Sequence, residues 1–216
     1  MTLNPTILYL KNVVCPRCIR IIEEELDRLG LPVTAVSLGQ ADLERPLEPE
    51  EREQVLSVLA NYGFEILEDK RAILVNQIKT ALISLIIFQE DRIKTNYSTY
   101  LAKITGKEYG TLSHTFSETE KFTIEKYIIL LKIEYIKAHM DYEELSLGEI
   151  AARLQYSSLS HLSKQFKAIT GYSPSEYKRQ PVKTRIPLNR LIDSNYANLI
   201  KDDIKPVGEG KGKKKA

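Results

Sequence analysis

The 216-residue sequence lacks the patterns that mark most enzymes and membrane proteins. It contains no glycine-rich phosphate-binding loop, no nucleophile elbow and no supported Ser/His/Asp constellation, so we expect no catalytic activity. No apolar run reaches the roughly 18 residues that a membrane helix requires, and no segment resembles a signal peptide. A cytoplasmic protein that does not span a membrane is therefore the expectation.

A strong excess of charge of either sign is also missing, because the net charge is only +2. The charge is nevertheless unevenly distributed. Residues 1–72 hold 8 Lys/Arg against 13 Asp/Glu, residues 73–180 hold 14 against 12, and residues 181–216 hold 9 against 4. Cations thus concentrate toward the C-terminal end, where a polyanion such as DNA would be attracted, while the N-terminal end would be repelled.

The most informative feature present is an internal repeat. Residues 96–127 recur loosely fifty positions later as residues 146–177, with apolar and aromatic positions matched. Leu112 corresponds to Leu162, and Phe116 corresponds to Phe166. Each copy is predicted to form two short helices with a tight link, and a doubled unit of this kind suits two successive turns of a DNA groove.

The second copy carries a specific motif, IAARLQYSSLSHLSKQFKAITGYSPSEYKR, which begins at Ile150. This segment resembles the C-terminal signature of the AraC/XylS family of bacterial transcription regulators. The resemblance implies two helix-turn-helix units within about residues 73–180, joined by a long helix over residues 123–140. It also implies double-stranded DNA as the partner, with RNA polymerase as a further candidate partner.

The presumed recognition helices supply the candidate DNA contacts. The second helix would enter a major groove with residues 158–170, since serine at its start is a good N-cap and Gly171 a good helix stop. The candidate contacts are Ser158, His161, Lys164 and Gln165, with Thr111, His114 and Thr115 as counterparts in the first unit. Gly110, Glu118 and Glu120 make the first unit a poorer match to the family, so we expect it to bind DNA less strongly.

The N-terminal 71 residues read as strand, helix, two strands, helix and strand. We expect strands near 7–13, 33–38, 41–43 and 64–67, with helices after Cys15 and from Pro49. This order predicts an α+β ferredoxin-like βαββαβ sandwich, followed by an all-α domain of two helix-turn-helix units and a long joining helix. The predicted domains are residues 1–71, 72–180 and a basic tail, partly disordered, over 181–216.

Cysteine is scarce, and both cysteines lie in a Cys-x-x-Cys at the first strand-to-helix turn. With the strand order, they resemble the heavy-metal-associated domains of copper chaperones and metal-pumping ATPases over residues 3–68. The resemblance implies that Cys15 and Cys18 bind a soft ion such as Cu(I), and a helix N-terminus should lower the thiol pKa. The sequence departs from that family at Asn12–Val13 and by placing Pro16 and Arg17 between the thiols.

Three interpretations of the thiols stay open: a soft-metal sensor, a redox pair that forms a disulfide, and a retained fold with inert thiols. Two cysteines cannot complete a four-ligand zinc site, so other ligands, a second chain or two-coordinate Cu(I) would be needed. The sequence favours a DNA-binding regulator modulated through this region. A metal chaperone with a helical interaction module is the rival class, and the oligomeric state stays open.

The two predicted domains are joined by a short connection. Residues 69–72 contain no glycine or proline and lead into a predicted helix over 74–88. A connection this short should transmit orientation between the domains, unlike a long flexible tether.

Overall fold

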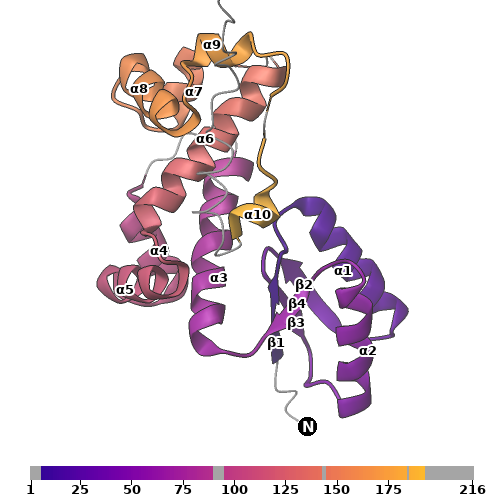
Figure 1. Ribbon diagram of the computed structural model, residues 1–216. Coiled ribbons are helices and arrows are strands. Elements are labelled where there is room, and N and C mark those ends of the chain that lie inside the picture. The colour runs from indigo at the N-terminus through magenta and orange to yellow at the C-terminus, as the bar shows by residue number, and fades with distance from the viewer. Residues whose placement is uncertain (1–5, 90–94, 143–144, 184, 193–216) are drawn as a thin grey trace, which may run out of the picture.

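A computed structural model of the chain describes residues 6–89, 95–142, 145–183 and 185–192. Figure 1 shows an N-terminal body of one sheet and two helices, followed by a body made only of helices. We refer to residues 6–67 as the N-terminal body and to the described residues from 70 to 192 as the helical body. The coarse prediction, α+β followed by all-α, is therefore confirmed.

The N-terminal body contains a small antiparallel sheet of four strands in the order β2-β3-β1-β4. Its elements are β1 (Thr6–Lys11), α1 (Pro16–Arg28), β2 (Val33–Ser37), β3 (Gln40–Leu43), α2 (Pro49–Ala60) and β4 (Glu65–Leu67). Leu8 and Leu10 alternate with more exposed residues along β1, and they share a core with Ile22 of α1 and Val55 of α2. One face of the sheet is therefore covered by α1 and α2 (Figure 1).

Two details of the N-terminal body differ from prediction. The first strand ends at Lys11 rather than Val13, because Asn12 adopts a positive φ of 70° and its side chain donates to the Gly63 carbonyl at 2.8 Å. The apolar residues of the helix from Pro49 predict that Val55, Leu56, Val58 and Leu59 all face inward, but Leu56 is 41% exposed. On α2 the buried residues are Val55 and Leu59, one helical turn apart, and Leu56 lies about 100° around the helix from Val55.

The connection to the helical body is shorter than predicted. Helix α3 (Lys70–Ile83) begins four residues earlier than expected, because the Asp69 side chain accepts a hydrogen bond from the Ala72 amide at 2.8 Å and caps the helix. Only residues 68 and 69 separate β4 from α3. The helix continues as a π-helical segment, η1 (Ser84–Phe88).

Helix α3 and η1 together are long and apolar enough to cross a membrane by length and composition alone. The segment is nevertheless 61% buried inside the protein. Its buried residues include Ile78, Leu82 and Ile86, which pack against the other helices. A helix that is apolar on several sides is typically found in the core of a protein, and the burial of this segment agrees with such a position.

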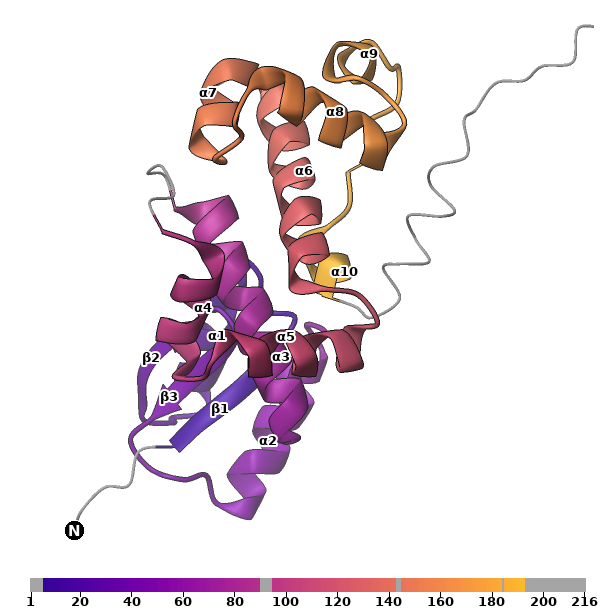
Figure 2. The same ribbon diagram turned by 90° about the vertical axis from the view of Figure 1, so that its left-hand side faces the viewer.

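The helical body contains two pairs of short helices on either side of α6 (Ile124–Tyr142) (Figure 2). The first pair is α4 (Tyr97–Thr105) and α5 (Tyr109–Glu120), and the second is α7 (Leu147–Arg153) and α8 (Leu159–Thr170), followed by α9 (Pro174–Lys178). Phe116, Tyr127 and Phe166 are fully buried and anchor the two pairs on α6. The predicted joining helix over 123–140 is therefore present.

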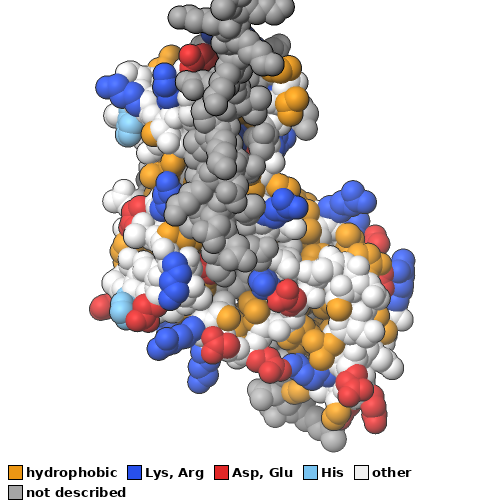
Figure 3. All heavy atoms as spheres, in the orientation of Figure 1, with side chains coloured by type: hydrophobic (Ala, Val, Ile, Leu, Met, Phe, Trp, Pro, Cys, Tyr) orange, Lys and Arg blue, Asp and Glu red, His pale blue; other side chains and the backbone are white. Residues whose placement is uncertain are grey.

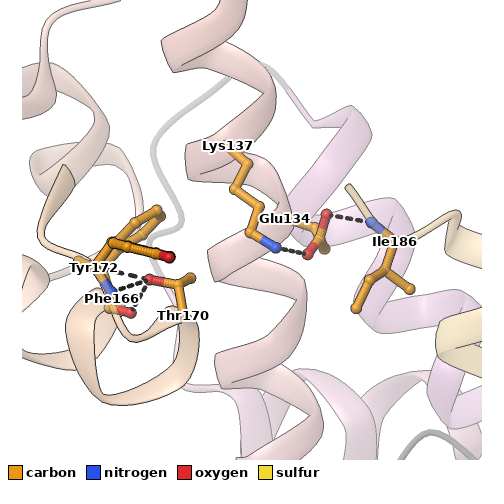
Figure 4. A network of polar contacts seen from close by, with 6 residues as sticks. All are labelled: Glu134, Lys137, Phe166, Thr170, Tyr172 and Ile186. Carbon is orange, nitrogen blue, oxygen red and sulfur yellow. Dashed lines mark hydrogen bonds and ion pairs between the residues drawn. The ribbon is translucent and has the colours of Figure 1, made fainter. Parts of the chain in front are cut away.

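The chain after α9 returns along α6 toward the N-terminal body. Figure 4 shows Glu134 of α6 between Lys137, whose ammonium lies 2.7 Å away, and Ile186, whose amide donates to Glu134 at 3.0 Å. Helix α10 (Leu188–Ile192) follows and buries Leu191 completely. The sequence from Leu188 to Ile200 is compatible with a short helix, and α10 is the start of it. The rest of that segment and the lysine-rich end at 208–216 lie outside the described residues.

Candidate nucleic-acid interface

Helices α5 and α8 lie on the same side of the helical body. In Figure 1 both are at the left-hand side, and in Figure 2, which views that side directly, both face the viewer at different heights along α6. The 19 residues of α6 span roughly 28 Å at about 1.5 Å per residue. Successive major grooves on one side of B-DNA are about 34 Å apart. The length of α6, which lies between the two helix pairs in the chain, is therefore comparable with one DNA turn.

The second unit is defined by local capping interactions. Ser146 accepts a hydrogen bond from the Glu149 amide at 3.2 Å, and the Glu149 side chain accepts from the Ser146 amide at 2.8 Å, which completes a capping box on α7. Ser158 caps α8 in the same way by accepting from the His161 amide at 3.1 Å. Gly171 ends α8 with a left-handed φ of 80°. The predicted helix limits of this unit are therefore accurate.

The four predicted contact residues of the second unit differ in how available they are. Lys164 and His161 are exposed, and within the described part of the chain no hydrogen bond or ion pair holds Lys164. The His161 ring lies edge-on to Tyr156, with its Nδ1 3.1 Å from the Ser157 hydroxyl. Ser158 is exposed but serves as the helix cap. Lys164 and His161 are thus the side chains best placed to reach outward.

Gln165 is engaged within the protein. It is half-buried, and its Oε1 accepts a hydrogen bond from the Tyr156 hydroxyl at 2.6 Å. Burial raises the pKa of Tyr156, so its hydroxyl stays protonated as a donor. The geometry makes Gln165 a residue that ties α8 to the link before it.

Two exposed residues of α8, Ser160 and Lys167, were not among the predicted contacts. Both lie at helical spacing from Lys164, four residues before it and three after it, so this spacing could have identified them. The spacing of the apolar residues predicts that Leu159 shares one face of the helix with Leu162, Phe166 and Ile169, but Leu159 is 47% exposed. It is the first residue of α8, where no preceding turn covers its side chain.

The first unit presents a different surface. Thr111 and His114 are exposed and Thr115 is half-buried. The His114 Nε2 lies 3.3 Å from a Glu118 carboxylate oxygen, and Arg71 of α3 lies 3.7 Å from the same carboxylate. Figure 3 shows the contrast: blue Lys/Arg spheres gather beside the pale blue histidine near α8, whereas red spheres flank the histidine near α5.

The second acidic residue of α5 is not on that surface. Glu120 is buried and lies 2.6 Å from the Lys79 ammonium of α3, with both side chains less than 5% exposed. It serves as a structural anchor for α5. Gly110, predicted to weaken the interior of the recognition helix, is only the second residue of α5, where a glycine costs less helix stability.

Two cations, the buried Lys132 and the half-buried Arg153, connect the units to their neighbours. The Lys132 ammonium of α6 donates to the Leu154 carbonyl at 2.7 Å and lies over the rings of Tyr97 and Tyr156. Burial lowers the pKa of Lys132 to about 8. Arg153 of α7 donates to the carbonyls of Ile86, at 3.0 Å, and Gln89, and stacks on Tyr135. The second unit is thus attached to α6 and to the end of η1.

The Cys-x-x-Cys lies where the two bodies meet. The Cys15 and Cys18 sulfurs are 2.9 Å apart, and both residues are half-buried. Val14, just before them, packs in the core of the helical body, and Cys18 packs against the cores of both bodies. The expectation of a lowered pKa is wrong for Cys18: its pKa is raised, first by burial and then by the hydrogen bond with Cys15.

The thiols have few neighbours that could complete a metal site. Within the residues the structure describes, no group of three or more His, Cys, Asp or Glu side chains could hold an ion. Two sulfurs match a two-coordinate thiophilic ion in number only, since a closed zinc site needs four ligands.

Comparisons with known proteins agree with the geometry of the helical body. Residues 101–180 match the family model of a helix-turn-helix domain. The chain is similar to the uncharacterized HTH-type transcriptional regulator YijO of Escherichia coli strain K12, with 26% identity over 144 residues, 63% of this chain and 50% of that protein.

A second relative is the uncharacterized HTH-type transcriptional regulator YdiP of the same strain, with 32% identity over 69 residues, 32% of this chain and 23% of that protein. The chain therefore spans half or less of the length of these relatives. No solved structure matches the chain. The matched segment runs from within α4 through α5, α6, α7, α8 and α9, so the chain contains a helix-turn-helix domain and is homologous to HTH-type transcriptional regulators.

Proposed function

We propose that this protein is a sequence-specific DNA-binding transcriptional regulator of the AraC/XylS type, acting in the cytoplasm without catalytic activity. The observation that carries the proposal is the placement of α5 and α8 on one side of the molecule, within a matched helix-turn-helix domain and joined through α6, whose length is comparable with one DNA turn. Two recognition helices spaced in this way enter two successive major grooves on one face of the duplex.

In this proposal α8 makes the stronger contact. Lys164 and His161 reach base edges, Lys167 pairs with phosphate, and the helix cap at Ser158 orients the first turn. Gln165 holds α8 against Tyr156. Thr111, His114 and Thr115 are the corresponding contacts of α5, and RNA polymerase is a candidate protein partner of the complex.

A selection from genomic DNA fragments tests the proposal. The full chain should enrich a defined motif, and Lys164→Ala should weaken binding to it by about 1–3 kcal/mol and relax specificity at one position. Arg20→Ala removes an equally exposed cation from α1, far from α8 in sequence, and is the matched control. If no motif is enriched, or if the two variants have equal effects, the proposal is wrong and a metal chaperone with a helical interaction module is favoured instead.

We propose further that the N-terminal body is a ferredoxin-like, heavy-metal-associated-like domain over residues 1–71, followed by a DNA-binding domain over 72–180 and a basic tail over 181–216. The alternation of strands and helices and the sheet order β2-β3-β1-β4 support the first assignment. Cys15 and Cys18 would bind a soft ion such as Cu(I) and modulate DNA binding.

A redox role for the same thiols is favoured by one observation, the 2.9 Å separation of the sulfurs. A disulfide bond is about 2.05 Å long, so only a small displacement is needed. Titration of the reduced protein separates the two roles. Stoichiometric Cu(I) binding that Cys15→Ser abolishes supports the metal role. A disulfide formed with oxidised glutathione, with no affinity for Cu(I), supports the redox role.

A further inference from the structure

A groove runs along the junction of the two bodies. Its volume is about 490 Å³, and it is bounded by the start of α1, the β2–β3 turn, the α3–η1 helix and α4. The lining residues on the helical side include Gln77, Ser84, Phe88, Tyr100 and Ile104. This volume lies within the range of about 300–1,000 Å³ that small-molecule sites occupy. The groove is therefore large enough for a compact organic ligand.

The lining of the groove is uncharged. In a chain of which 28% of residues are charged, none of the described residues that line the groove is Asp, Glu, Lys, Arg or His. Two large apolar side chains in it are exposed to solvent, Phe88 (36%) and Ile104 (55%). Hydrogen-bonding groups are present but neutral, from the amide of Gln77 and the hydroxyls of Ser84 and Tyr100.

We propose that this groove binds an uncharged small molecule with an apolar or aromatic body and one or two hydrogen-bonding groups. An ionic ligand would lose its hydration there without gaining an opposite charge. The apolar side chains supply the contact area, and the neutral amide and hydroxyl groups orient the ligand. The lysine-rich end of this chain, with four lysines and one glutamate in residues 208–216, is not the expected occupant, because the groove has no carboxylate to pair with its lysines.

The position of the groove connects ligand binding to the first helix-turn-helix unit. Tyr100 and Ile104 belong to α4, whereas Gly39 belongs to the β2–β3 turn. The turn packs tightly on α3: a Cβ on Gly39 would lie only 2.9 Å from side-chain atoms of Asn76 and Thr80. A ligand between these surfaces contacts both bodies at once, so it favours one relative orientation of them. This second step rests on the proposed DNA-binding function.

Binding is tested first without DNA, with the neutral fluorophore N-phenyl-1-naphthylamine as the probe. The full chain should bind it saturably. Ile104→Arg places a charge at the groove, and Gln77→Trp fills it, so each should weaken binding at least tenfold. Leu56→Arg alters an apolar residue of α2 that is similarly exposed, at 41%, and does not line the groove, so it should bind as the wild type does. Cooperative thermal unfolding verifies that each variant is folded.

Several outcomes would overturn the site: no saturable binding, equal losses in Ile104→Arg and Leu56→Arg, or unchanged binding in Gln77→Trp. A concentration-dependent dimer that Ile104→Arg dissociates, with no probe binding, would assign the groove to a second copy of the chain. With a selected DNA motif in hand, saturating probe should change its affinity by fivefold or more. Failure to select any DNA motif contradicts the proposed function but leaves the probe measurements intact.

Discussion

The two helix-turn-helix units bury equivalent residues but stabilise their helices differently. Ser158 caps α8 through its hydroxyl, whereas Glu108 precedes α5 without any side-chain cap. After the helix, Gly171 adopts the left-handed conformation that glycine favours, and Lys121 adopts it at a φ of 65° in the first unit. Helix α8 is therefore stabilised at both ends by its own sequence, while α5 carries local costs that other contacts must offset.

Thr170 in the second unit and its counterpart Glu120, fifty positions earlier, show which contacts offset the local costs of the first unit. Thr170 closes the end of α8 by itself, because its hydroxyl donates to the Phe166 carbonyl at 2.9 Å and accepts from the Tyr172 amide at 3.2 Å (Figure 4). Its counterpart Glu120 instead forms a buried ion pair with Lys79 of α3. The end of α5 thus depends on the helix that also contacts the N-terminal body, whereas the end of α8 is held by residues of its own unit.

The largest effect should follow from breaking that ion pair. Lys79→Met leaves the Glu120 carboxylate buried without its partner, so the free energy of unfolding should fall by about 3–5 kcal/mol. Urea denaturation measures the change. The double variant Lys79→Met/Glu120→Leu should recover most of the loss, and Thr170→Val in the second unit should cost only about 1 kcal/mol. A loss below 1 kcal/mol in Lys79→Met would show that the first unit does not rely on α3.

The connection between the units should be sensitive to pH through Lys132. Its pKa is about 8 in the folded protein, against 10.5 ordinarily, so between these values the unfolded chain binds the proton and the folded chain releases it. The free energy of unfolding should therefore rise with pH from 8 toward 10, by at most about 3 kcal/mol from this group.

Denaturation of the wild type and of Lys132→Met at pH 7, 8, 9 and 10 measures this contribution as the difference in slope. The raised pKa values of Tyr97, at about 12, and Tyr156 act at higher pH and in the opposite direction. Identical pH dependence in the two proteins would mean that Lys132 is not desolvated as the structure shows.

Removing the N-cap of α8 and adding one to α5 tests whether the two helices differ in stability because of their caps. Ser158→Ala should lower the free energy of unfolding by about 1 kcal/mol, because the His161 amide loses its acceptor. Glu108→Ser should raise it by a similar or smaller amount, since α5 gains a cap that it lacks. Thermal and chemical denaturation of both variants measure the changes. A loss in Glu108→Ser would show that Glu108 has a role the geometry does not reveal.

The smallest effect concerns DNA affinity at the first unit. Glu118→Gln removes the carboxylate beside His114, so affinity for non-specific duplex DNA at low salt should rise by about threefold, roughly 0.6 kcal/mol. Fluorescence anisotropy across a salt series measures it. Glu149→Gln, on α7 of the second unit, removes a carboxylate that already caps its own helix and serves as the charge-matched comparison. Unchanged affinity in Glu118→Gln would place α5 away from the duplex.

The amino-acid sequence alone determined the features that depend on near neighbours. The repeat, the ends of α7 and α8 and the alternation of strands and helices were predicted correctly, because caps, turn residues and apolar periodicity act within a few positions. The motif around Ile150 was also sufficient to predict the helix-turn-helix domain that the family match supports.

Only the tertiary structure decided how distant residues are used. Glu120 was expected to weaken DNA binding, but Lys79, forty-one positions earlier, holds it in the interior. Gln165 was expected to reach a base, but Tyr156 engages it, and the thiol of Cys18 is half-buried against both bodies where a lowered pKa was expected. Periodicity predicts which side of a helix is buried. The hydrogen-bond and ion-pair partners of a side chain, the loss of water around a thiol and the groove beside Ile104 arise only when separate elements pack together.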